Sequence, residues 1–159
     1  MAMSLTMTAE SKHALYDRAF QQITAMLQGE TDEIARMASV SAILAGTFEA
    51  FYWTGFYRFV DGELVIGPYQ GTPGCLRISL ARGVCGTAAH RKETVIVPDT
   101  AAFPGHIACD ARSRSEIVVP VLDASGNLLA VLDVDSVSLG TFDDIDQAGL
   151  ERILAAVFS

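Results

Sequence analysis

The hydrophobic period of the chain changes near residue 50, and this change limits the possible folds more than any other feature of the sequence. Before that point, apolar residues recur at helical spacing in two groups, at 16–27 and 34–45. After it, residues 51–60 are rich in aromatic and β-forming residues and end at Asp61-Gly62, a dipeptide typical of a tight hairpin turn. The chain is therefore predicted to begin with two helices and to continue as a sheet.

The remaining segments are predicted from turn residues and local period. A returning strand at 63–70 completes the hairpin, and glycines bound a short helix at 83–90. Further strands are predicted at 94–97, 116–122 and 128–135, and a helix at 143–158. A strand meander between terminal helices is typical of an α+β domain with a mostly antiparallel sheet. The long loop that follows Pro98-Asp99 has the length of a functional or disordered segment.

Composition and charge exclude several classes of protein. The chain has 159 residues, which suits one domain, and its 50% apolar content argues against disorder. A net charge of −8 repels phosphate backbones and anionic lipids. The sequence shows neither an apolar run long enough for a membrane span nor the basic start of a signal peptide. We therefore expect a cytoplasmic protein with no nucleic-acid or membrane partner.

Three cysteines, at 75, 85 and 109, lie in glycine-rich or loop-like segments. Free cysteines most often fill small apolar spaces in a core. A zinc site of the three cysteines with His106 is a second interpretation, but the sequence lacks the closely spaced cysteine pair typical of structural zinc. The third interpretation is redox chemistry, with a thiolate stabilised at a helix start for Cys85, or by His106 and nearby arginines for Cys109. Spacing alone does not rank the three cysteines.

Two aspartates share one face of a predicted strand, because strand side chains alternate between faces. On this pattern alone, Asp133 and Asp135 are best explained as the solvated face of a half-buried strand. If strands 116–122 and 128–135 pair antiparallel, Glu116 lies toward the same end as Asp135. Three adjacent acids repel each other unless they hold a cation or share a proton, as in a site for a ligand ammonium or a general acid.

Two aromatic residues also share a strand face. Trp53 and Tyr57 are four positions apart in the first predicted strand. Core packing is the usual fate of strand aromatics, and a pocket wall for a small apolar group is the functional alternative.

Five segments carry a more specific signature: FYWTGFY at 51–57, GVCGTA at 83–88, FPGHIACD at 103–110, SEIVVP at 115–120 and LDVDS at 132–136. Together they resemble the free methionine-(R)-sulfoxide reductases, which are stand-alone GAF domains. The GHIACD and SEIVVP strings are not found in a generic GAF domain. The resemblance covers nearly the whole chain and implies a GAF domain at 13–159 after a variable extension at 1–12.

The resemblance implies a role for each candidate residue. Cys109 would attack the sulfur of free methionine-(R)-sulfoxide, Cys75 would resolve the oxidised thiol as a disulfide, and Cys85 would be an auxiliary or alternative resolving thiol. The substrate would be bound by three acids and two aromatic residues: Glu116, Asp133, Asp135, Trp53 and Tyr57. Electrons would come from thioredoxin, no metal or organic cofactor would be needed, and the protein would form a homodimer.

Two other functions stay open. GAF domains commonly act as sensors of small ligands such as cyclic nucleotides, and reactive cysteines can also serve as a redox switch without turnover. Residue 128 is leucine, so the Asn-Lys pair of cyclic-nucleotide-binding relatives is missing at Asn127. This departure argues against a cyclic-nucleotide sensor.

Overall fold

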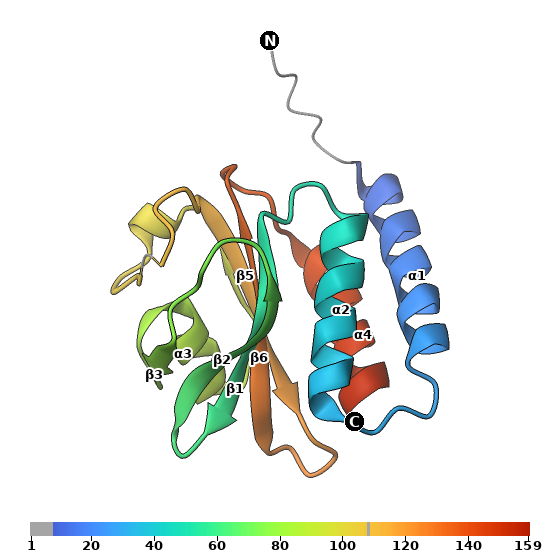
Figure 1. Cartoon of the computed structure of the whole chain (residues 1–159). Helices are drawn as coiled ribbons and strands as arrows, with labels where there is room; N and C mark the ends of the chain where they lie inside the picture. The colour runs from blue at the N-terminus through green and yellow to red at the C-terminus, as the bar shows by residue number, and fades with distance from the viewer. Residues whose placement is uncertain (1–7, 108) are drawn as a thin grey trace.

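The computed structural model describes residues 8–107 and 109–159, and it confirms the predicted α+β fold with an antiparallel sheet (Figure 1). The first half contains α1 (Ala9–Met26), α2 (Glu33–Thr47), β1 (Trp53–Val60), β2 (Glu63–Gln70) and β3 (Arg77–Ser79). The second half contains α3 (Gly83–Arg91), β4 (Val95–Val97), a 3-10 turn (Thr100–Ala102), β5 (Ser115–Leu122), β6 (Leu128–Ser136) and α4 (Asp144–Phe158). Strand β3 is the one element of the described sheet that the sequence did not predict.

The six strands form one sheet in the order β3-β2-β1-β6-β5-β4, and every pair is antiparallel. The β1–β2 hairpin turns at Asp61 and Gly62, whose φ angles are 50° and 83°. Left-handed φ at both central residues is what a type I′ turn requires, and it explains the Asp-Gly pair. Strand β1 also pairs with β6, so the two halves of the chain meet in the middle of the sheet.

Both faces of the sheet are covered. Helices α2 and α4 pack on one face, with α1 lying against them on the outside, while α3 lies on the other face, as Figure 1 shows. On β6, Leu132 and Val134 join the core under the three helices, and Val131 joins the core under α3. Strand β6 is therefore buried on both sides, and its α3-facing positions include Asp133.

The terminal helices are tied together by a buried polar network. The Lys12 Nζ lies 2.6 Å from the Asp146 carboxylate, and the Tyr16 hydroxyl donates to the same carboxylate at 2.7 Å. Burial and the nearby Asp146 raise the pKa of Tyr16, so its hydroxyl stays protonated.

Lys12 belongs to the extension that was expected at 1–12. Residues 1–7 of this extension lie outside the described residues, and Ala9–Lys12 form the start of α1. Among the described helices, none is both long and apolar enough to cross a membrane.

Candidate active site

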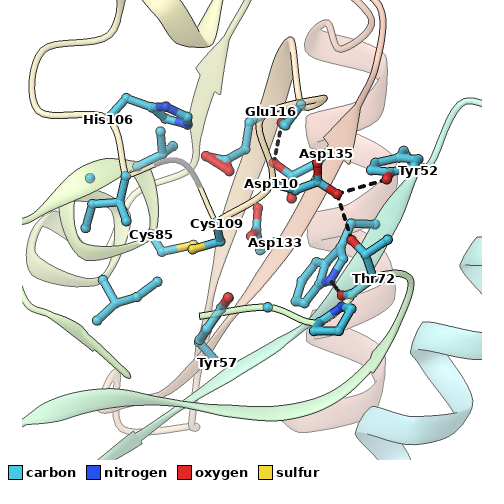
Figure 2. A pocket seen from close by; sticks show the side chains of 18 of the residues that line it. Tyr52, Tyr57, Thr72, Cys85, His106, Cys109, Asp110, Glu116, Asp133 and Asp135 are labelled. Atoms are coloured by element: carbon cyan, nitrogen blue, oxygen red, sulfur yellow. Dashed lines mark hydrogen bonds between the residues drawn. The ribbon is translucent and has the colours of Figure 1, made fainter. Parts of the chain in front are cut away.

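One pocket, between the sheet and the start of α3, gathers nearly all of the predicted site residues (Figure 2). It encloses about 560 Å³ of empty space, part of it open to solvent. The predicted residues that line it are Trp53, Tyr57, Cys85, Cys109, Glu116, Asp133 and Asp135. Cys75 is not in the lining, but it is joined to Cys109 by a disulfide.

The disulfide links two loops that are far apart in the sequence. Cys75 precedes β3, and Cys109 lies in the loop before β5, 34 positions later. Their Cα atoms are 5.4 Å apart, within the usual range for a disulfide. Cys109 is exposed and Cys75 is half-buried, so the disulfide lies near the surface of the molecule.

Cys85 differs from the other two cysteines. It is free and buried in the first turn of α3, the helix start that the sequence predicted. Burial raises the pKa of its thiol well above the usual value, and the nearby Asp133 and Glu116 raise it further. Desolvation and the negative neighbours therefore oppose the thiolate that the sequence suggested for Cys85 at this helix start.

The three predicted acids come together on adjoining strands. Glu116 lies directly opposite Asp135, and Asp133 is opposite Val118. One carboxylate oxygen from each residue lies within 4.8 Å of the other two. Glu116 and Asp133 are only 6% and 5% exposed, whereas Asp135 is half-buried, so the solvated-face interpretation is wrong for Asp133. The pattern showed that the two aspartates share a face, but α3 and the long loop cover that face.

Burial and mutual repulsion control the protonation of this acid cluster. Desolvation is the main cause that raises the pKa of all three carboxyl groups, and the negative neighbours add to it for Glu116 and Asp133. The Ser113 hydroxyl donates to Asp135 at 3.0 Å and favours its charged form. Among the described atoms, the buried Asp133 Oδ1 has no hydrogen-bond partner. The cluster is thus built to hold protons when empty or a cationic group when occupied.

The aromatic residues form a wall on the neighbouring strands. The ring centroids of Trp53 and Tyr57 lie 5.8 Å apart, and the Tyr69 ring stacks on Trp53 with the centroids 5.0 Å apart. Trp53 Nε1 donates to the carbonyl of Thr72 at 2.8 Å. Trp53 and Tyr57 are both buried and both line the pocket. The two interpretations of this pair, core packing and a pocket wall, therefore both hold.

Sequence reasoning missed a polar group beside the disulfide. The Asp110 carboxylate accepts hydrogen bonds from the hydroxyls of Tyr52 and Thr72, each at 2.8 Å, and pairs with Arg112 at 3.1 Å. Arg112, which was expected near Cys109 as a cation, instead lowers the pKa of Asp110. Asp110 was visible as part of the GHIACD string, but Tyr52 lies just before β1 and Thr72 lies in the loop after β2.

A bound cation would meet oxygen rather than sulfur ligands. Glu116, Asp133 and Asp135 are the described side chains close enough together to share a metal ion. A zinc site of the cysteines with His106, the alternative that the sequence already disfavoured, fits poorly because Cys75 and Cys109 bond to each other and offer no thiolate in this state.

The sequence of the chain matches a known domain family, in agreement with the fold. The model of the GAF domain matches residues 31–157, so the chain is a GAF-domain protein. It is 48% identical to GAF domain-containing protein A of Dictyostelium discoideum, over 97% of both chains. It is also 41% identical to the free methionine-R-sulfoxide reductase of Escherichia coli, over 91% of this chain and 87% of that one.

A solved structure gives the same relation. The free methionine-R-sulfoxide reductase of Neisseria meningitidis, in complex with its substrate, matches with a TM-score of 0.88 and 42% identity, over 98% of this chain and 93% of that one. The chain therefore belongs to the free methionine-R-sulfoxide reductase family of GAF domains.

Proposed function

We propose that the protein reduces free methionine-(R)-sulfoxide to methionine. The observation that carries this proposal is a pocket in which a disulfide-forming cysteine, three carboxyl groups, two of them buried, and an aromatic wall converge (Figure 2). The relatives named for this activity support the substrate.

The acid cluster activates and orients the substrate. A sulfoxide oxygen is a strong hydrogen-bond acceptor and a poor leaving group, so it needs a proton donor. Burial raises the pKa values in the cluster and so favours a protonated carboxyl group, which can donate to that oxygen. Another carboxylate of the cluster pairs with the substrate ammonium, while Trp53 and Tyr57 enclose the methyl group.

Cys109 carries out the reduction. Its thiolate attacks the substrate sulfur, the oxygen is protonated and passes to the cysteine sulfur, and methionine leaves. Sulfur in the substrate is reduced by two electrons, and Cys109 is oxidised to a sulfenic acid.

Cys75 then completes the cycle. Its thiol displaces the hydroxyl of the sulfenic acid as water and forms the Cys75–Cys109 disulfide. Thioredoxin reduces this disulfide by dithiol exchange and is itself oxidised. Cys85, with its raised pKa, is a poor attacking thiol, and we assign it an auxiliary role. The homodimer and the cytoplasmic location stay predictions.

One assay tests this function against its alternatives. Pre-reduced protein is mixed with free methionine-(R)-sulfoxide without any reductant, and methionine and the disulfide are measured together. We expect about one equivalent of each, because the first turnover needs only the two thiols. Binding of the sulfoxide without methionine release would support a sensor. A disulfide that forms with peroxide but never with the sulfoxide would support a redox switch.

A further inference from the structure

Asp110 connects the two cysteine loops by contacts that do not involve sulfur. It is the neighbour of Cys109 in the chain, and its carboxylate accepts from Thr72 Oγ1, three residues before Cys75, at 2.8 Å. It also accepts from the Tyr52 hydroxyl at 2.8 Å, next to the start of β1. Figure 2 shows Asp110 between Tyr52 and Thr72, with dashed lines to both.

Both ends of this connection are held in place. Thr72 is fixed to β1 because its carbonyl accepts from Trp53 Nε1 at 2.8 Å. Arg112 donates through Nε and its terminal nitrogen to the two Asp110 oxygens, each at 3.1 Å, and lies over the Tyr52 ring at 5.3 Å. The Arg112 backbone amide adds a further bond to Asp110 at 2.9 Å. The carboxylate therefore has few degrees of freedom left.

These contacts matter most when the disulfide is open. The loop that holds Cys109 spans the residues between the 3-10 turn and β5, and a reduced loop of this length loses entropy each time it brings Cys109 back to Cys75. Hydrogen bonds to a charged acceptor are stronger than neutral ones, so the Asp110 contacts can hold the loop without the covalent link.

We propose that Asp110 is a positioning residue that holds Cys109 beside Cys75 in the dithiol state, and thereby favours closure of their disulfide. This inference deepens the proposed function, on which its relevance to turnover rests. The closure itself is an exchange between two thiols and an oxidant, and it can be measured without the sulfoxide.

The first experiment measures the equilibrium between the Cys75–Cys109 disulfide and glutathione of fixed reduced-to-oxidised ratio. Asp110→Asn keeps the size of the side chain but removes the charged carboxylate that accepts hydrogen bonds from Tyr52, Thr72 and Arg112. We expect the equilibrium constant for disulfide formation to fall by about tenfold or more, a rise in reduction potential of about 30 mV. Asp99→Asn is the matched control, because Asp99 accepts from Ala101 N within its own loop.

A second variant removes the hydrogen bond between Thr72 and Asp110 but keeps the charge of Asp110. Thr72→Val is close in shape to threonine and leaves the Thr72 carbonyl free to accept from Trp53, but it removes the hydroxyl that donates to Asp110. We expect it to lower the same equilibrium constant, and to have little further effect when combined with Asp110→Asn. Equal constants for wild type, Asp110→Asn and Thr72→Val would overturn the proposal.

Single-turnover kinetics complete the test. With free methionine-(R)-sulfoxide, Asp110→Asn should release methionine in the first step and close the disulfide more slowly, so that a sulfenic-acid trap captures more Cys109 than in wild type. Disulfide closure as fast as in wild type would contradict the inference. Absence of methionine release by the wild type would instead overturn the proposed function, and the glutathione equilibrium would still test Asp110.

Discussion

Glu116 and Asp135 lie directly opposite each other on β5 and β6, where two like charges normally destabilise a sheet. The pair is tolerated because burial raises both pKa values, which favours the protonated, uncharged form of these carboxyl groups. A substrate ammonium would take over the role of these protons and release them from the cluster.

Stability should depend on pH through the acid cluster. The three carboxyl groups have pKa values raised above their unfolded values, so the folded state binds more protons between the two. The stability contribution is therefore full below the usual carboxyl pKa and is lost as the pH rises through the raised values. Urea unfolding of the oxidised protein should give a lower free energy of unfolding as the pH rises. The combined Glu116→Gln, Asp133→Asn and Asp135→Asn variant should flatten this slope, and equal slopes would contradict the pKa shifts.

Replacing Asp133 or Asp135 by asparagine should impair catalysis more than folding. Asparagine keeps the shape but supplies neither a carboxylate for the ammonium nor a proton for the oxygen, so kcat/KM should fall by about tenfold or more. The free energy of unfolding at neutral pH should change by less than about 1 kcal/mol, because the repulsion is relieved. Steady-state kinetics and urea unfolding check both parts. Normal kinetics in both variants would remove the acids from the mechanism.

Cys109→Ser should abolish the first turnover. A serine hydroxyl is almost wholly protonated at neutral pH and is a far weaker nucleophile than a thiolate. Methionine released per protein, measured without reductant, should be close to zero, while Cys85→Ser should release it as the wild type does. A full equivalent from Cys109→Ser would assign the attack to another thiol.

Cys75→Ser should keep the single turnover and lose recycling by thioredoxin. The sulfenic acid on Cys109 then has no partner in the neighbouring loop, and the buried Cys85 thiol is mostly protonated. Methionine release should stay near one equivalent, with NADPH consumption through thioredoxin reductase much reduced. Unchanged steady-state turnover would make Cys85 the main resolving thiol.

The pocket should select both the free amino acid and one sulfur epimer. The S epimer points its oxygen away from the acid that protonates it and leaves a buried polar group unpaired, at a cost of about 1–3 kcal/mol. An N-acetyl group removes the cation that the carboxylates need. Rates on free R, free S and N-acetylated methionine sulfoxide should therefore differ strongly, with free R the fastest. Similar rates on peptide-bound sulfoxide would show that the acids do not recognise the ammonium.

Local patterns predicted most of the fold and the shared faces of the site. The period-2 alternation placed Asp133 beside Asp135 and Trp53 beside Tyr57, and the Asp61-Gly62 turn set the hairpin. Strand β3 was missed because three residues, one of them buried, carry too little pattern to stand out from a loop.

Long-range contacts were beyond local patterns. Local sequence patterns do not reveal that α3 covers the strand face with Asp133. The prediction that Asp133 faces solvent was wrong for this reason. Nor could spacing reveal that Asp110 reaches Thr72 and Tyr52, because all three come from different segments. The roles of the cysteines came from resemblance to a family, not from their positions.

The pairing of β1 with β6 also bears on when the pocket comes into existence during folding. The aromatic wall starts on β1 and two of the acids stand on β6, and Gly55 pairs with Asp133 although nearly half of the chain lies between them. Contacts between such distant segments form slowly, because the chain loses conformational entropy before the contacts can stabilise it. A chain still emerging from the ribosome thus carries its three cysteines before the pocket around them exists. Oxidants can reach these thiols during that interval, whereas the proposed discrimination among sulfoxides begins only when the last strands have joined the first.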